Sequence, residues 1–149
     1  MSRLLRILYC SRSCVTGSRA EVEMQIRMIL ATARTGNREA RLTGALTFNE
    51  NYFAQVLEGA PADLVPLFGR IRHDPRHRDV KILAESHPAR RLFPHWSMAF
   101  VDAPHGDGRH PLAHFTFEAA LTGGTGPEAE QLLKILRQTI LVGGKLVAN

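Results

Sequence analysis

Residues 42–59 read Leu-Thr-Gly-Ala-Leu-Thr-Phe-Asn-Glu-Asn-Tyr-Phe-Ala-Gln-Val-Leu-Glu-Gly. Two apolar runs, 42–48 and 52–58, flank the turn-forming residues at 49–51, and this pattern predicts a β-hairpin. Because side chains alternate along a strand, Phe53, Gln55 and Leu57 share one face of the second strand. Burying an amide without partners costs about 1–3 kcal/mol by mutational estimates. We therefore expect Gln55 to have a hydrogen-bond partner on that face.

A short apolar run near the N-terminus predicts a strand that could supply this partner. Residues 4–10 read Leu-Leu-Arg-Ile-Leu-Tyr-Cys, which is typical of a buried strand. Tyr9 shares a face with Leu5 and Ile7, and its hydroxyl can donate or accept a hydrogen bond. Tyr9 is thus a candidate partner of Gln55. On composition alone, the pair is most simply a satisfied hydrogen bond in the core.

A helix is expected between this strand and the hairpin. Ser18 followed by Glu21 forms a capping box, which predicts a helix from there to about residue 35. Gly36 and Asn37 suit the end of that helix. Taken alone, Asn37 is most simply a C-cap. Its carboxamide also offers a donor and an acceptor side by side, which complements a ring that carries an N–H beside a carbonyl.

One more helix and two strands are predicted after the hairpin. The helix runs over about 62–73 and ends at Asp74-Pro75, because the residue before a proline disfavours the helical conformation. It contains Pro66 near its first turn, where proline is tolerable. Residues 80–86 and 96–101 are the further strand candidates.

The resulting order, β-α-β-β-α-β-β, predicts a ferredoxin-like α+β fold. In this arrangement two helices cover one face of a mostly antiparallel sheet. The first and third strands are neighbours at its centre. Tyr9 and Gln55 are therefore expected on adjacent central strands.

The remaining sequence predicts a helical extension. Residues 103–111 are rich in turn-forming residues, 112–121 are expected to be helical, and Pro127 begins a last helix whose apolar stripe contains Leu132, Leu136 and Ile140. We place a first domain at 1–102 and the extension at 103–149. The extension covers the second face of the sheet or forms an interaction surface.

Composition restricts the class of protein. The chain has 149 residues, of which 44% are hydrophobic and 22% charged, as in a single globular domain. No apolar run approaches the roughly 20 residues of a membrane span, and we expect a cytoplasmic protein. The net charge is +5, but the arginines are scattered, which favours a solvated surface over a nucleic-acid site. Cys10 and Cys14 lack a second pair that would complete a metal site, so we expect reduced thiols and no metal.

Two further groups of residues have both a functional and a plain interpretation. Arg76 and His77 follow the second helix, where they could bind a phosphate or a ring carbonyl, or simply form a solvated helix end. Trp96 and Met98 lie two residues apart and are expected on one strand face. They could line a pocket or fill the core.

Together these residues resemble a known family. The resemblance rests on Tyr9, on Asn37 followed by Leu42-Thr43-Gly44, on Phe53-Ala54-Gln55-Val56-Leu57-Glu58-Gly59, on Asp74-Pro75-Arg76-His77 and on Trp96-Ser97-Met98. In this order and spacing, over about residues 4–100, they resemble the BLUF domain, a blue-light sensor that uses a flavin. Gly36 departs from the family, which usually has a polar residue there, and Pro66 is also unexpected.

The resemblance implies a photoreceptor without enzymatic turnover. FAD, with FMN or riboflavin as possible alternatives, would lie between the two helices. Asn37 would hold the ring edge, and Gln55 would bridge the Tyr9 hydroxyl and the flavin. Light would draw an electron and a proton from Tyr9 and leave the Gln55 amide rotated or tautomerised. The residues implied in cofactor binding are Tyr9, Ile29, Asn37, Leu46, Phe53, Gln55, Asp74, Arg76 and His77.

The resemblance also implies an output. Trp96 and Met98 would sense the change at Gln55 and relay it to the last strand and the C-terminal helices. The short chain leaves no room for a fused enzyme, so we expect a separate, unidentified partner protein and a homo-oligomer.

Two other functions are compatible with this fold. A small acyl phosphate hydrolase needs a phosphate-binding backbone and an arginine after the first strand. Residues 11–18 contain Arg12 and Gly17 but no glycine-rich loop. An RNA-binding sheet exposes aromatic residues for base stacking. In this chain only Phe53 or Tyr52 could stack on a base, and the expected string of basic and aromatic residues is missing.

Overall fold

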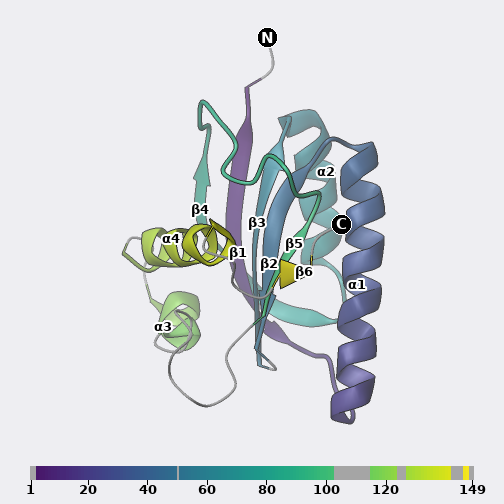
Figure 1. Ribbon diagram of the computed structural model, residues 1–149. Helices are drawn as coiled ribbons and strands as arrows, with labels where there is room; N and C mark the ends of the chain where they lie inside the picture. Colours follow the sequence, from purple (N-terminus) through teal and green to yellow (C-terminus); the bar gives the residue numbers. More distant parts are fainter. Residues whose placement is uncertain (1–2, 50, 103–114, 124–126, 142–145, 148–149) are drawn as a thin grey trace.

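The described residues of the computed structural model form a six-stranded sheet with helices on both faces (Figure 1). The structure describes residues 3–49, 51–102, 115–123, 127–141 and 146–147. The strand order is β4-β1-β3-β2-β5-β6, and every pair is antiparallel except β2 with β5. The strands are β1 (Leu5–Ser13), β2 (Thr43–Phe48), β3 (Tyr52–Gly59), β4 (His77–Ser86), β5 (Ala99–Asp102) and β6 (Leu146–Val147).

Each face of the sheet has its own apolar core because side chains alternate along β1, β2 and β3. Helices α1 (Arg19–Glu39) and α2 (Pro61–Arg72) pack on the face that carries Tyr9, Leu46 and Phe53. Helices α3 (Phe117–Thr122) and α4 (Pro127–Leu141) pack on the face that carries Leu8 and Val56. The ferredoxin-like α+β arrangement is thus confirmed, and the C-terminal helices cover the second face (Figure 1).

Helix α1 begins as predicted but ends later. Ser18 and Glu21 form the expected capping box. The expected stop at Gly36 and Asn37 is wrong, because the helix continues to Glu39 and both residues lie in its last turns. The chain leaves the helix through Arg41, which has a φ of 58°. A non-glycine residue therefore takes the left-handed conformation that commonly ends a helix.

The last strands differ most from the expectation. β4 begins at His77 rather than at residue 80, and β5 begins at Ala99 rather than at residue 96. Trp96 and Met98 therefore lie in the connection before β5 and not on a strand. β6 was not expected. The linker 103–111, residues 112–114 and the side chain of Ile140 lie outside the described part of the chain.

A buried carboxylate fastens the connection between β4 and β5 to the sheet. Glu58 on β3 is fully buried. Its carboxylate accepts a hydrogen bond from Arg6 Nε at 2.8 Å and others from the backbone N–H groups of Leu92 and Phe93 at 2.9–3.0 Å. Arg91 adds a hydrogen bond to Thr43 Oγ1 at 2.8 Å. These contacts fix the connection that leads to Trp96 and Met98.

Candidate functional site

Tyr9 and Gln55 form a direct side-chain pair in the centre of the sheet. They are register partners on β1 and β3, and the Tyr9 hydroxyl donates to Gln55 Oε1 at 2.5 Å. Both side chains are buried. Burial raises the pKa of the Tyr9 phenol well above its usual value, because a charged phenolate is poorly stabilised away from water. Tyr9 is therefore a neutral hydrogen-bond donor, and Gln55 is the partner that the sequence predicted for it.

The other end of the Gln55 amide faces the segment before β5. Gln55 Nε2 donates to the sulfur of Met98 at 3.5 Å. Met98 is fully buried in the core under α1 and α2. The amide thus joins two strands of the sheet to the β4–β5 connection, and any reorientation of the amide changes both contacts.

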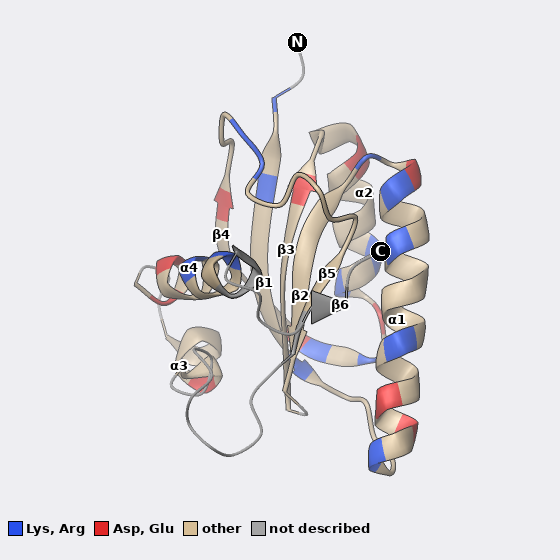
Figure 2. Cartoon of the chain, in the orientation of Figure 1, with Lys and Arg blue, Asp and Glu red and all other residues tan. Residues whose placement is uncertain are grey.

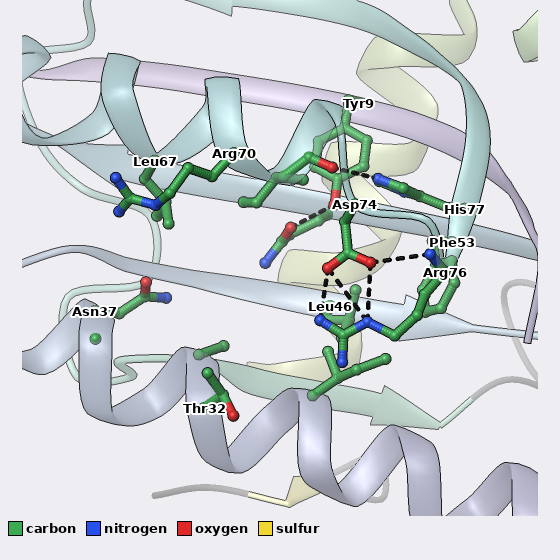
Figure 3. Close-up of a pocket in the computed structure, with 15 residues that line it drawn as sticks. Tyr9, Thr32, Asn37, Leu46, Phe53, Leu67, Arg70, Asp74, Arg76 and His77 are labelled. Atoms are coloured by element: carbon green, nitrogen blue, oxygen red, sulfur yellow. Dashed lines mark hydrogen bonds and ion pairs between the residues drawn. The ribbon is translucent and has the colours of Figure 1, made fainter.

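A cavity of about 360 Å³ lies between the sheet and helices α1 and α2 (Figure 3). Such a volume lies within the range of roughly 300–1,000 Å³ typical of small-molecule sites. The cavity is bordered by every residue that the resemblance implied in cofactor binding: Tyr9, Ile29, Asn37, Leu46, Phe53, Gln55, Asp74, Arg76 and His77. The structure brings them together around one space. Their contact with a flavin stays a prediction.

Several lining residues were missed by the sequence analysis. They are Thr32, Ala33, Gly36, Leu67, Arg70 and Ile71. The helical spacing of three of these residues is a signal that could have identified them from the sequence. Thr32, Ala33 and Gly36 follow Ile29 at intervals of three, four and seven along α1, so they share its helical face.

Asn37 is a buried side chain of α1 and not a helix cap. It is 2% exposed, and its Nδ2 donates to the backbone carbonyl of Ser97 at 2.8 Å. This bond uses one amide hydrogen and leaves the second N–H and the amide oxygen for other partners. Asn37 therefore connects the cavity to the segment that precedes β5.

Asp74 and Arg76 pair with each other at the cavity (Figure 3). Asp74 accepts three side-chain hydrogen bonds from Arg76, at 2.5 Å from Nη2 and at 2.9 and 3.2 Å from Nε. These bonds lower the pKa of the Asp74 carboxyl and raise the pKa of the Arg76 guanidinium. Arg70, on the last turn of α2, borders the same cavity and is exposed. The site thus combines apolar walls with a partly neutralised cationic edge.

His77 has protein partners at both ring nitrogens. Its Nε2 lies 2.5 Å from the Ile71 carbonyl, and its Nδ1 lies 2.7 Å from Ser11 Oγ. The ring stands edge-on to Tyr9 and Phe53 at 6.0 Å. A carbonyl only accepts, so Nε2 is the donor and carries a hydrogen. His77 therefore borders the cavity with both ring nitrogens already bonded.

Trp96 and Met98 lie in different cores. Met98 packs with Tyr9 under α1 and α2, whereas Trp96 packs against the core under α3 and α4. The expectation that they share a strand face is wrong, because the chain bends before β5 and turns the two side chains to opposite faces of the sheet. The short segment 96–98 consequently touches both layers of helices.

A ferredoxin-like sheet with a buried Tyr–Gln pair beside a cavity of small-molecule size defines a class of α+β domain, and the match to a family model identifies which one. The chain matches the family BLUF, described as sensors of blue-light using FAD, over residues 4–99. The chain therefore belongs to the BLUF family of flavin-dependent blue-light sensors.

Curated relatives and solved structures agree with this assignment. The chain is 34% identical over 98 residues to the photoactivated adenylate cyclase subunit beta of Euglena gracilis, covering 65% of this chain and 11% of that protein. It is 35% identical over 69 residues to the blue light- and temperature-regulated antirepressor BluF of Escherichia coli K12, covering 46% of this chain and 17% of that protein. The chain thus spans less than a fifth of the length of these relatives.

Two solved BLUF structures match nearly the whole chain. The dark state of BlrB has a TM-score of 0.72 at 27% identity, covering 95% of this chain and 98% of that chain. The ground state of BlsA has a TM-score of 0.74 at 26% identity, covering 95% of this chain and 90% of that chain. The match extends beyond the family region into the C-terminal helices.

Proposed function

We propose that this chain binds FAD between α1 and α2 and registers blue light through Tyr9 and Gln55. The observation that supports this most directly is the hydrogen bond of 2.5 Å between the two side chains at the wall of a cavity. The residues fit a flavin. Apolar side chains such as Ile29, Leu46 and Leu67 would enclose the ring system, and Asn37 offers the paired donor and acceptor that a ring edge with an N–H beside a carbonyl needs.

The bound flavin supplies the absorption of blue light and the capacity to accept an electron and a proton. Tyr9 holds its proton in the dark, since burial raises its pKa. Its bond to Gln55 Oε1 would be the path along which this proton leaves, together with an electron from the Tyr9 ring, and returns on recombination. Gln55 then has two discrete arrangements, because an amide in a low-dielectric core reorients between defined partners. In the dark arrangement its Nε2 donates to Met98 Sδ. In the lit arrangement that donor is withdrawn.

FAD is the proposed flavin rather than FMN or riboflavin. The family description names FAD, and Arg70 and Arg76 at the cavity offer cationic groups for a phosphate. One solved structure, that of BlrP1 from Klebsiella pneumoniae, contains FMN together with cyclic diGMP. Release of the flavin from purified protein by denaturation, followed by chromatography against FAD, FMN and riboflavin, identifies the molecule.

We infer that the chain signals to a separate partner or through its own oligomer, without enzymatic turnover, from within the cytoplasm. No helix in the described part of the chain is long and apolar enough to cross a membrane. In the described part of the chain, Lys and Arg positions are spread over several elements, among them α1, β1 and α4 (Figure 2). The proposed output surface is the outer side of α4, where Lys134 and Arg137 are exposed. Residues 1–102 remain the proposed sensor domain and 103–149 the proposed output extension.

An RNA-binding function receives no support from the sheet. Phe53 is buried against the cavity core. The Tyr52 ring stacks on Phe117 of α3, with centroids 5.3 Å apart and planes 7° apart. Helices cover both faces of the sheet, so these aromatic rings do not offer an open stacking platform.

Purified protein incubated with FAD tests the central proposal. The expected result is a yellow protein whose absorption shifts slightly to the red under blue light and returns in the dark. Reversal in the dark is expected because no covalent product forms. A protein that stays colourless after incubation with FAD would refute flavin binding, and a yellow protein without a reversible shift would refute the proposed light response.

A further inference from the structure

Three successive backbone carbonyls before β5 accept hydrogen bonds from other elements. The Trp96 carbonyl accepts from the Gly44 N–H at 3.1 Å. The Ser97 carbonyl accepts from Asn37 Nδ2 at 2.8 Å, and the Met98 carbonyl accepts from Arg34 Nε at 3.0 Å. The first donor belongs to β2 and the other two are side chains of α1. Helix α1 therefore holds segment 96–98 from the cavity side of the sheet.

Arg34 differs from Asn37 in one respect. Asn37 borders the cavity, whereas Arg34 does not. Arg34 is partly buried and lies three residues before Asn37, on the same side of the helix. It donates to the segment and lies outside the cavity lining. A change at Arg34 can therefore alter the segment while leaving the Tyr9–Gln55 pair in place.

Met98 accepts one hydrogen bond at its side chain and one at its backbone. Its sulfur accepts from the Gln55 amide at 3.5 Å, and its carbonyl accepts from Arg34 at 3.0 Å. A sulfur is a weak acceptor, so the amide alone holds it weakly. The charge-assisted bond from a guanidinium is stronger. The hydrogen bond on the Met98 backbone is thus the stronger of the two.

We propose that Arg34 is a positioning residue for the light response: by holding the Met98 carbonyl it keeps Met98 against Gln55, so that a change of the amide is transmitted through segment 96–98 to Trp96. This inference rests on the proposed function. Trp96 packs on the opposite core, with α3 and α4, so the segment carries the change from one face of the sheet to the other. Without Arg34, the flavin site still responds to light but the segment no longer follows it.

Arg34→Met tests this proposal, because methionine has a similar reach and no hydrogen-bond donor. The flavin-loaded full chain is studied in the dark and under continuous blue light. Hydrogen exchange is followed in peptides that cover residues 96–100, and the emission of Trp96, the single tryptophan of the chain, is a second probe of the segment. In the wild type we expect illumination to speed exchange in the segment and to change the emission.

In Arg34→Met we expect the red shift of the flavin to persist while the segment stops responding. Dark exchange in 96–100 rises about tenfold, since a hydrogen bond from a charged donor is worth about a factor of ten in an equilibrium constant. The ratio of lit to dark exchange falls toward one, and the emission change is lost. A merely structural role would raise exchange equally in light and dark and leave that ratio unchanged. Arg34→Lys, which keeps a cationic donor, restores most of the ratio.

Two further variants serve as a control and as a replacement for Arg34→Met. Arg27→Met removes an exposed arginine from the same helix and should behave as the wild type. Arg34→Gln, whose shorter side chain does not reach the carbonyl, replaces Arg34→Met if that variant does not fold. A wild-type ratio in Arg34→Met or Arg34→Gln overturns the inference, as does a wild-type segment that ignores light despite a red shift. A wild type without any red shift instead overturns the proposed function itself.

Discussion

The Tyr9 hydroxyl donates to Gln55 Oε1 at 2.5 Å, and the two residues are register partners on β1 and β3. The sheet holds their backbones side by side, so the two side chains are preorganised to form this hydrogen bond. The remaining freedom belongs to the Gln55 amide, whose nitrogen faces Met98. A rigid donor opposite an amide with two possible orientations is the arrangement from which a reversible switch can be built.

Tyr9→Phe should abolish the light-induced red shift while leaving flavin binding largely intact. The substitution removes the hydroxyl and leaves the ring that packs on Phe68 at 5.5 Å. Gln55 Oε1 loses its partner, which costs about 1–3 kcal/mol of folding free energy because the oxygen is buried. Absorption spectra before and after blue light, with urea unfolding, measure both effects.

The second tyrosine of the chain provides the matched control for that change. Tyr52 lies on β3 but points to the opposite face of the sheet and bonds Glu118. Tyr52→Phe should keep the full red shift. A normal red shift in Tyr9→Phe, or its loss in Tyr52→Phe, would contradict the assignment of Tyr9 as the donor.

Asn37→Ala should weaken flavin binding by about tenfold, which corresponds to the loss of one buried hydrogen bond of about 1.4 kcal/mol. The carbonyl of Ser97 also loses its donor, so the free energy of unfolding should fall even in the apo protein. Titration of apo protein with FAD gives the affinity. Asn49→Ala is the control, because Asn49 Oδ1 accepts from the backbone N–H groups of Asn51 and Tyr52 in the hairpin turn. Unchanged affinity in Asn37→Ala would refute the proposed role.

The central sheet and the Tyr9–Gln55 pair were predictable because strand alternation and hairpin composition are local signals. The positions of Trp96 and Met98 were not. They depend on where the chain bends before β5, and that bend is set by hydrogen bonds from Arg34 and Asn37, which are distant in sequence. The end of α1 was missed for a similar reason. Gly36 predicts the end of a helix, but the hydrogen bond from the buried Asn37 side chain to the Ser97 carbonyl favours another turn of helix.

Glu58→Gln should destabilise the fold by about 2–4 kcal/mol, because it leaves a buried donor set without its anionic acceptor. Glu58 is fully buried and accepts from Arg6, Leu92 and Phe93. A neutral amide turns one N–H toward these donors. Urea unfolding measures the loss, and Glu85→Gln, on the exposed part of β4, should change little. Equal stability of the two variants would show that the carboxylate does not anchor the connection.

Glu118 should make the docking of α3 depend on acidity. Its carboxylate accepts from Arg12 at 2.5–2.6 Å and from the Tyr52 hydroxyl at 2.5 Å. The Arg12 bonds, followed by the Tyr52 bond, lower the pKa of Glu118 to about 2. A carboxyl whose folded pKa is depressed stabilises the fold above its unfolded pKa, and this contribution is lost as the pH falls through the folded pKa.

The difference in unfolding free energy between wild type and Glu118→Gln isolates this contribution. We expect a constant difference above pH of about 4.5, a decline between about 4.5 and 2, and convergence below that range. The contribution is modest in salt, since Glu118 is half exposed and exposed ion pairs are screened. Arg12→Met should remove the larger share of this pH-dependent part and not all of it, because the Tyr52 hydroxyl still donates to Glu118. A difference that stays constant from pH 6 to pH 2 would show that α3 is held by the stacking of Phe117 on Tyr52 and not by the carboxylate.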